Sequence, residues 1–166
     1  MKRLSTVLIC LAMMAALVAC GGDKAKETSG TVEKAAPAGK AYDGQYFSFN
    51  VADGWDAGPL TFGMVNVLPK GKVSPGLYFK FEGDGHAVGT AEESINGMIS
   101  NYGGSPMTST TIAGVEFKTT TYSTSGMTQT MHVAFRNGTR ITITIEGPDG
   151  KENPDIKAML ETVALK

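Results

Sequence analysis

Several short stretches of the chain alternate between hydrophobic and polar residues. The alternation has a period of two over residues 47–51, 77–82 and 115–118. Because every second side chain of a strand points to the same face, each stretch predicts a half-buried β-strand. Residues 60–68 show a weaker strand pattern, and residues 108–144 are rich in threonine, which favours sheet over helix. The pattern therefore predicts a sheet as the main element of the fold.

An Asn-Gly pair at residues 137–138 predicts a hairpin between strands 128–136 and 139–146. A two-residue loop would pair apolar with polar side chains, whereas a three-residue loop with a glycine bulge would pair Val133 with Ile141. The second register is predicted because it gathers the apolar side chains on one face. That face would hold Met131, Val133, Phe135, Ile141, Ile143 and Ile145, and the opposite face Thr130, His132, Ala134, Arg140, Thr142 and Thr144.

Two helices are predicted from capping residues and from apolar spacing. Thr90 and Glu93 form a capping box, and apolar residues follow at helical spacing as far as Tyr102. Asn153 and Pro154 begin a second amphipathic segment close to the end of the chain. Strands, a helix, more strands and a final helix predict a single α+β domain. We expect an antiparallel sheet of about six strands with helices packed on it.

The first residues are typical of an export signal. A short basic start precedes an uncharged apolar stretch over residues 7–19, which is shorter than the roughly 20 residues of a spanning helix. The end of this stretch, Leu17-Val18-Ala19-Cys20, resembles the lipobox of bacterial lipoproteins. The resemblance implies cleavage after Ala19, a diacylglycerol thioether on Cys20 and acylation of the new amino terminus. An ordinary signal peptide with a chance cysteine at the boundary is the alternative.

These features divide the chain into a signal peptide (1–19), a lipidated cysteine with a flexible tether (20–43) and a folded domain (44–166). The tether is predicted to be flexible because it carries too few apolar groups to offset the entropy of ordering. Gly21 follows the cysteine, and Asp23 stands too late for an inner-membrane retention signal. By resemblance we expect the periplasmic face of the outer membrane, with the inner or cytoplasmic membrane as the alternative.

The start of the folded region resembles PsbP-like domains. Tyr46-Phe47-Ser48-Phe49-Asn50-Val51 is followed by Asp53-Gly54-Trp55, which is similar to the strand and Gly-Trp pair that open those domains. The middle helix, the Ile112-Ala113-Gly114-Val115 turn, the long hairpin and the closing helix come in the same order. The resemblance covers residues 44–166 and implies an antiparallel sheet sandwiched by helices. It implies no particular function, because fold does not determine function.

Charge and cysteine content narrow the functional classes. The formal net charge is −1, which argues against nucleic acid as a partner because such partners select basic surfaces. The two cysteines are Cys10, which leaves with the signal, and Cys20, which carries the lipid. The folded domain therefore has no disulfide and no cysteine metal site. We also expect no cofactor.

Two groups of residues are candidates for a binding site. His132, Arg140 and Tyr122 are predicted to line a polar groove beside the threonine-rich sheet face, although a histidine bonded to a neighbouring threonine is the alternative for His132. The second group, Glu82, Asp84 and His86, alternates along the chain, so its carboxylates and imidazole would point to one side and bind a divalent cation. The alternative for this group is a solvated loop.

A catalytic constellation is absent from the sequence: it has no nucleophile elbow and no cysteine–histidine pair. The prediction is a membrane-anchored periplasmic lipoprotein that is not an enzyme and binds another protein or an envelope component. Its membrane contact would be the lipid on Cys20. The alternative is a lipoprotein that binds a small ligand or a metal ion in the groove on the threonine-rich face. Trp55 is predicted to anchor the core.

Overall fold

The computed structural model describes residues 39–83 and 86–166. The lipobox, Cys20 and most of the expected tether lie outside these residues. The described strands are β1 (Ala41–Asp43), β2 (Phe47–Asn50), β3 (Trp55–Pro59), β4 (Met64–Pro69), β5 (Gly76–Glu82), β6 (Thr108–Ile112), β7 (Val115–Thr124), β8 (Met127–Arg136), β9 (Thr139–Glu146) and β10 (Ala164–Leu165). The helices are α1 (Ala91–Tyr102), the short 3-10 helix η1 (Gly150–Glu152) and α2 (Pro154–Glu161).

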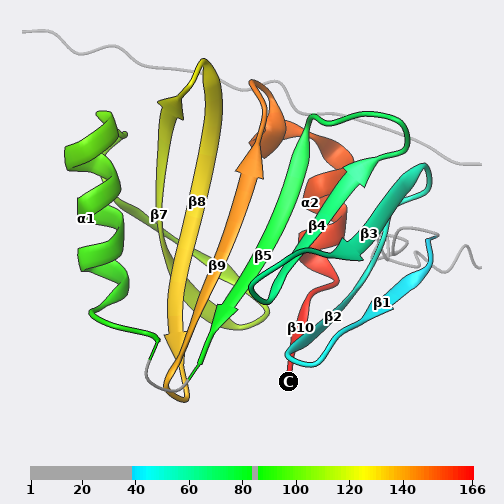
Figure 1. Ribbon diagram of the computed structural model, residues 1–166, viewed down its shortest axis with the longest axis horizontal. Coiled ribbons are helices and arrows are strands. Elements are labelled where there is room, and N and C mark those ends of the chain that lie inside the picture. The colour runs from blue at the N-terminus through cyan, green and yellow to red at the C-terminus, as the bar shows by residue number, and fades with distance from the viewer. Residues whose placement is uncertain (1–38, 84–85) are drawn as a thin grey trace, which may run out of the picture. The chain divides into compact units, whose positions relative to one another are not determined.

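Two antiparallel sheets are present in this part of the chain. The larger has seven strands in the order β3-β4-β5-β9-β8-β7-β6, and the smaller has three in the order β1-β2-β10 (Figure 1). The predicted α+β class with antiparallel strands is confirmed. The strand number exceeds the expected six or so because β1, β3, β6 and β10 are short and carry no clear alternation. β1 also begins at Ala41, inside the segment assigned to the tether, so the ordered structure starts before residue 44.

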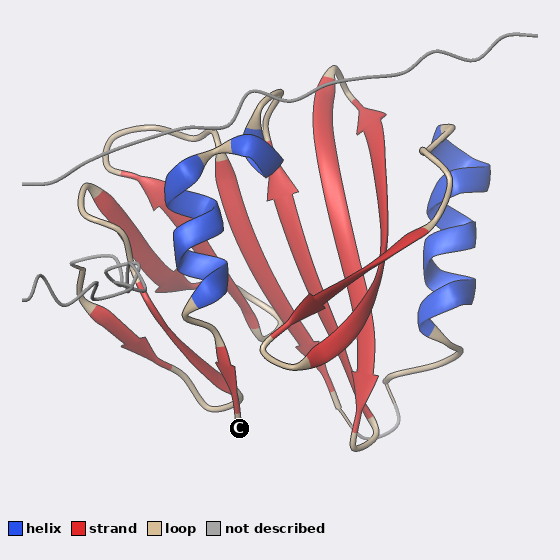
Figure 2. Cartoon of the chain, turned by 180° about the vertical axis from the view of Figure 1, so that it is seen from behind, coloured by secondary structure: helices blue, strands red, loops and turns tan. Residues whose placement is uncertain are grey.

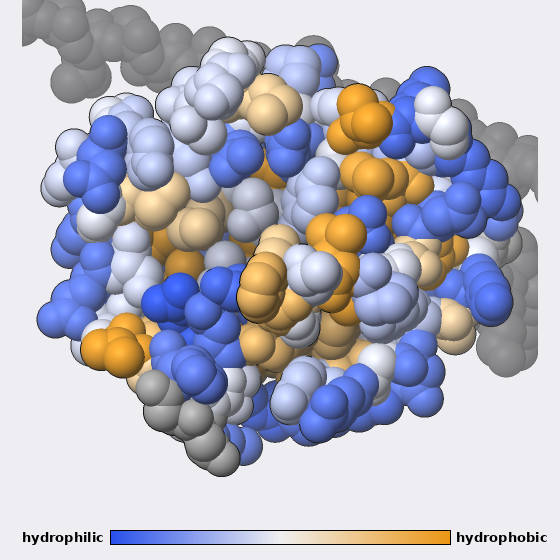
Figure 3. Space-filling model, in the orientation of Figure 1, coloured by the Kyte–Doolittle hydropathy of each residue, from blue (hydrophilic) through white to orange (hydrophobic). Residues whose placement is uncertain are grey.

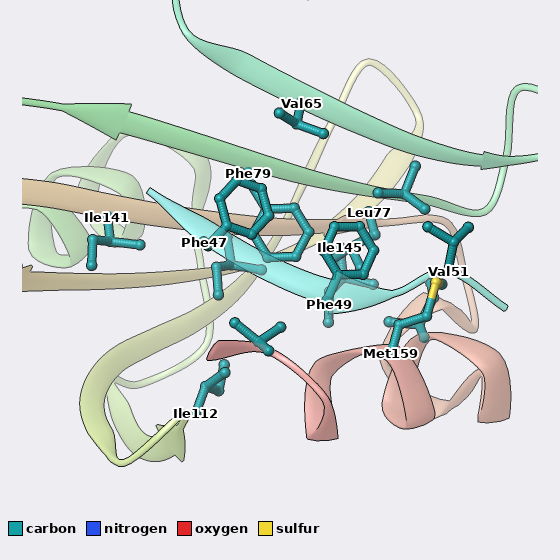
Figure 4. Close-up of a cluster of buried hydrophobic side chains, with 14 of the residues drawn as sticks. Phe47, Phe49, Val51, Val65, Leu77, Phe79, Ile112, Ile141, Ile145 and Met159 are labelled. Carbon is teal, nitrogen blue, oxygen red and sulfur yellow. The ribbon is translucent and has the colours of Figure 1, made fainter. Parts of the chain in front are cut away.

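The two sheets face each other across a hydrophobic core. Phe47 and Phe49 of β2 pack against Phe79 of β5, with ring centroids 4.5 and 5.2 Å apart (Figure 4). Ile156 and Met159 of α2 are fully buried on the same side. Full burial of side chains this large contributes roughly 1.5–3 kcal/mol each, so the region between the sheets accounts for much of the stability.

Trp55 ties the start of the large sheet to α2. Its side chain is 7% exposed, and its indole Nε1 donates a 2.9 Å hydrogen bond to Asp155 Oδ2. The prediction that Trp55 anchors the core is confirmed. The bond also satisfies the one polar atom of a buried indole, which would otherwise lose its contact with water.

The two helices lie on opposite faces of the large sheet. α1 packs on β7 and β8, whereas α2 and β6 lie together on the other side (Figures 1 and 2). Both predicted helices are confirmed, with the capping box of Thr90 and Glu93 at the start of α1 and with Asn153 capping α2. α1 ends at Gly103, whose φ of 64° is the left-handed conformation that glycine adopts without strain.

The predicted register of the long hairpin is wrong. β8 and β9 are joined by a two-residue turn at residues 137–138, and Val133 lies opposite Thr142 rather than Ile141. Ile141, Ile143 and Ile145 therefore share a face with Thr130, His132 and Ala134, on the side of α2. The prediction assumed one buried face, but α1 covers part of the other face, where Val133 is buried. When both faces carry apolar cover, segregation of apolar residues no longer selects the register. The turn determines the register, because the left-handed backbone conformations of Asn137 and Gly138 match the twist of the strands.

Candidate functional site

A groove of about 700 Å³ runs between β6 and α2, over the α2 side of the large sheet. We call it the β6–α2 groove. β6 lies over the same side of the sheet as α2 (Figure 2) because the strongly bent β7 carries it there. One wall is formed by Thr108, Thr110, Thr111 and Ile112 of β6, the floor by Thr119, Thr121, Thr130, His132 and Ile145, and the other wall by Lys151, Glu152, Lys157, Leu160 and Glu161.

The floor of the groove consists of cross-strand pairs of polar side chains. β7 and β8 are in register so that Thr119 lies opposite His132, and Thr121 lies opposite Thr130. Thr119 Oγ1 is 2.8 Å from His132 Nδ1, and the hydroxyl oxygens of Thr121 and Thr130 are 2.9 Å apart. The two members of each pair hydrogen-bond to each other, so each of these side chains has a partner in the absence of a ligand.

His132 is buried and neutral at physiological pH. Its side chain is 8% exposed, and burial lowers its pKa from 6.5 to about 4. The expected alternative, a histidine bonded to a neighbouring threonine, is confirmed by the contact with Thr119. The second ring nitrogen, Nε2, is also buried and has no hydrogen-bond partner within residues 39–83 and 86–166. A buried polar atom without a partner is uncommon and is a feature of sites that take up a ligand or water.

The helical wall of the groove differs in character from the β6 wall. It carries two lysines and two glutamates, and Lys157 forms a 2.5 Å ion pair with Glu152. Leu160 adds an apolar surface between them. The β6 wall carries hydroxyl and methyl groups but no charge. The charges of the groove are therefore balanced and confined to one side.

Tyr122 and Arg140 lie on the other face of the large sheet, so they do not join His132 in one groove. Tyr122 lines a depression of about 420 Å³, together with Tyr78 and other residues of the sheet face that is turned away from α2, which is the side seen in Figure 3. The expectation of one groove lined by all three residues is wrong. The incorrect hairpin register placed Arg140 beside His132, and Tyr122 lies on the opposite face of β7 from Thr119 and Thr121. Ligand binding by any of the three is still a prediction.

The depression on this face contains Tyr122 but not Arg140. Tyr122 donates a 2.7 Å hydrogen bond to Gln129, and burial raises the pKa of Tyr122. Arg140 lies outside the depression, where its guanidinium is 2.6 Å from a carboxylate oxygen of Glu82. Thr142 and Thr144 line the depression, while Thr130 lines the groove. The threonine-rich face of the prediction is thus divided between both sides of the sheet.

The expected metal site receives no support from the described geometry. Asp84 lies outside the described residues. Burial raises the pKa of Glu82, but hydrogen bonds and charges from Lys80 and Arg140 outweigh it and lower the pKa. Both carboxylate oxygens of Glu82 already face cations, with Lys80 Nζ at 2.7 Å. Within the described ranges, no group of three acidic, histidine or cysteine side chains is placed to hold a metal ion.

Sequence reasoning missed both walls of the groove. The turn at Ala113 and Gly114 was recognised, yet Thr108–Ile112 was not identified as the strand that leads into it. The threonine-rich segment before this turn favours a strand, so the strand could have been inferred from the sequence. The helical wall could not have been inferred from the sequence, because no local pattern places α2 opposite β6.

Comparison with known proteins supports the fold. No protein-family model matches the sequence, and no curated protein is similar to it. Among solved structures, the cyanobacterial PsbP protein CyanoP from Synechocystis is similar with a TM-score of 0.52 and 13% identity, over 90% of this chain and 99% of that one. The described part of the chain adopts a PsbP-like α+β fold.

Two further structures are similar to parts of the chain. A protein from Bacteroides thetaiotaomicron has a TM-score of 0.55 at 11% identity over 77% of this chain, and this chain spans about half (48%) of that structure. LpqN, a protein involved in cell envelope biogenesis of Mycobacterium tuberculosis, has a TM-score of 0.42 at 14% identity, covering 78% of this chain and 86% of that one. None of the helices in the described ranges is long and apolar enough to cross a membrane.

Proposed function

We propose that this protein is a non-enzymatic binding module of the bacterial envelope, and that the β6–α2 groove is its binding site. The observation that carries the proposal is the groove itself, with the unpartnered Nε2 of His132 in its floor. Its volume of about 700 Å³ is within the range of ligand sites in proteins. A partner that reaches the floor meets the side chains of its threonines, while Nε2 of His132 lies beneath the surface.

The chemistry of the floor supports binding over catalysis. A hydroxyl nucleophile needs a base that is in turn oriented by a third group. Thr119 and His132 form the first pair, but Nε2 of His132 contacts no carboxylate within the described residues. The glutamates of the groove are on the helical wall, where Glu152 is bound to Lys157. The pair is therefore assigned a role in holding the floor together.

The envelope location is proposed from the lipobox-like residues that end at Cys20. One acyl chain binds a membrane only marginally, whereas two or more hold it stably, so a lipidated Cys20 would keep the domain at the membrane. The groove partner would then be a protein or envelope component within reach of the tether. A small molecule in the same groove is the alternative outcome of the tests.

The anchor is tested by metabolic labelling. Labelled palmitate is expected in the wild-type chain and not in Cys20→Ala. Cys10→Ala is the matched control, because it removes the other cysteine and leaves the acceptor in place. Label retained by Cys20→Ala would contradict the anchor and leave the groove unaffected.

The binding site is tested by photo-crosslinking in cells. A photoreactive amino acid at Thr110 stands on the wall of the groove, and one at Thr144 stands in the depression on the opposite sheet face. Both threonines are half-buried, so they are a matched pair. We expect a reproducible adduct from position 110 and none from position 144. Adducts from position 144 alone, or from neither position, would contradict the proposed site.

A further inference from the structure

We propose that the partner enters the β6–α2 groove as an extended peptide segment that pairs with the outer edge of β6. This inference rests on the proposed function and adds how the partner is held. The large sheet would gain an eighth strand, lying between β6 and α2. Recognition of this type draws affinity from main-chain hydrogen bonds and specificity from alternate side chains.

β6 is an edge strand whose outer side is unpaired within the described residues. It is the last strand of the seven-stranded sheet, and β7 is its one neighbour. An unpaired edge presents a row of N–H and C=O groups that can template another strand. Charged side chains, which commonly protect such edges, are absent from the sequence Thr-Ser-Thr-Thr-Ile of β6.

The register identifies the main-chain groups on that outer edge. Ile112 and Val115 flank the two-residue turn and form a hydrogen-bonded pair, as the turn requires. Antiparallel pairs alternate between bonded and non-bonded, so Thr110 and Thr108 also bond to β7. The N–H and C=O groups of Ser109 and Thr111 consequently point away from β7.

The groove offers room for a single strand beside that edge. Its volume is bounded on one side by residues of β6 and on the other by α2 and η1, with the sheet as its floor. The helical wall excludes the edge of a second folded sheet, because such a sheet would bring its own covering layer into the space that α2 occupies. An isolated extended segment fits these boundaries.

Charge determines which side chains of the segment face the floor. Thr119, Thr121, Thr130 and His132 carry no charge at neutral pH, since the pKa of His132 is about 4. A charged side chain buried against them would have no counter-ion there, and burial of an unpaired charge is costly. Alternate residues of the segment are therefore uncharged. Valine and threonine meet this condition and favour the extended conformation.

The test uses a synthetic peptide of alternating valine and threonine with a lysine at each end. Binding to the full chain in detergent is measured by amide hydrogen exchange in the β6 segment. Thr111→Pro removes an outward N–H that β7 does not use, and proline is tolerated on an edge strand in that position. Thr111→Val keeps the N–H and is the matched control.

The peptide is also made in two N-methylated forms, with methyl groups on one or the other set of alternate residues. Only one set of N–H groups can face β6. We expect the unmodified peptide to slow exchange in the wild-type chain and in Thr111→Val. Affinity should fall about tenfold in Thr111→Pro, and one of the two methylated peptides should lose binding. If Thr111→Pro fails to fold, strand pairing is tested with the methylated peptides and with Ser109→Pro, which removes the other outward N–H group.

Two results would overturn strand pairing. The first is no protection of β6 by the peptide. The second is equal binding by Thr111→Pro or by both methylated forms. A crosslinked adduct from position 110 that persists in either case would show that the groove binds a partner by other contacts, so the proposed function would stand. Loss of that adduct as well would contradict both the strand pairing and the proposed binding site.

Discussion

Thr119 and His132 lie directly opposite each other on β7 and β8, with 2.8 Å between the threonine hydroxyl oxygen and the imidazole Nδ1. The contact joins two strands in the floor of the β6–α2 groove. It leaves Nε2 of the same ring buried and without a partner in the described chain. The state of this imidazole therefore reports directly on the floor of the proposed site.

His132 should remain neutral well below the usual range of histidine. Burial lowers its pKa to about 4, whereas the unfolded chain has a histidine pKa of 6.5. The unfolded state therefore binds more protons between these values, and stability should fall as the pH drops from 6.5 to 4. A pKa difference of this size corresponds to about 3 kcal/mol. NMR titration of the imidazole and unfolding curves over this pH range measure both effects. A His132 pKa near 6.5 would contradict the buried site, and His132→Gln should flatten the pH dependence.

Replacing Thr119 with valine should destabilise the domain by about 1–3 kcal/mol, because the buried Nδ1 of His132 loses its partner while the side-chain volume is kept. Thr108→Val removes an exposed hydroxyl from the same sheet and is the control, with little change expected. Denaturant unfolding measures both. Equal stability of the two variants would show that the Thr119–His132 contact contributes nothing.

The indole of Trp55 and the carboxylate of Asp155 should be coupled in a double-mutant cycle. Trp55→Phe and Asp155→Ala each remove the 2.9 Å hydrogen bond between β3 and α2. The loss of the second partner should then cost less than the loss of the first. A coupling energy of about 1 kcal/mol is expected from thermal or denaturant unfolding. Additive effects would mean that burial of the indole ring alone anchors β3.

Ala113→Gly should stabilise the hairpin that carries β6. Ala113 has a φ of 52°, a left-handed conformation that is unfavourable for a residue with a side chain. Glycine relieves that strain but gains entropy in the unfolded chain, so a net gain of about 0.5–1 kcal/mol is expected. Gly114 has a φ of 74°, so Gly114→Ala adds a side chain at a left-handed position and should destabilise the domain. A loss of stability in Ala113→Gly would contradict the observed turn.

The secondary structure of the core was predictable because local signals agreed with the tertiary structure. The alternation around Phe47 and Phe79, the capping box at Thr90 and the Asn153–Pro154 pair each specify their element without distant partners. The PsbP-like resemblance added the order of elements. Short strands such as β6 and β10 were not predicted because their sequences, Thr-Ser-Thr-Thr-Ile and Ala-Leu, do not alternate between apolar and polar residues.

The composition of the site was not predictable, because it depends on which sheet face each residue occupies. The register argument placed His132, Arg140 and Thr142 on one face, whereas the two-residue turn puts His132 on the α2 side and the other two on the α1 side. A register shift of one residue reverses every side chain. The opposing positions of β6 and α2, which create the groove, are a tertiary relationship with no local signal.

The most direct measurement is the labelling rate of single cysteines in cells, since no cysteine follows Cys20 in the sequence. Thr110→Cys places a thiol on the groove wall, and Thr144→Cys places one on the opposite sheet face as the control. If the groove is occupied in the cell, a maleimide should label position 110 more slowly in cells than in the purified protein, with position 144 unchanged relative to its own purified form. If the ratio of the labelling rate in cells to the rate in the purified protein is the same at positions 110 and 144, the assignment of the β6–α2 groove as the binding site is contradicted.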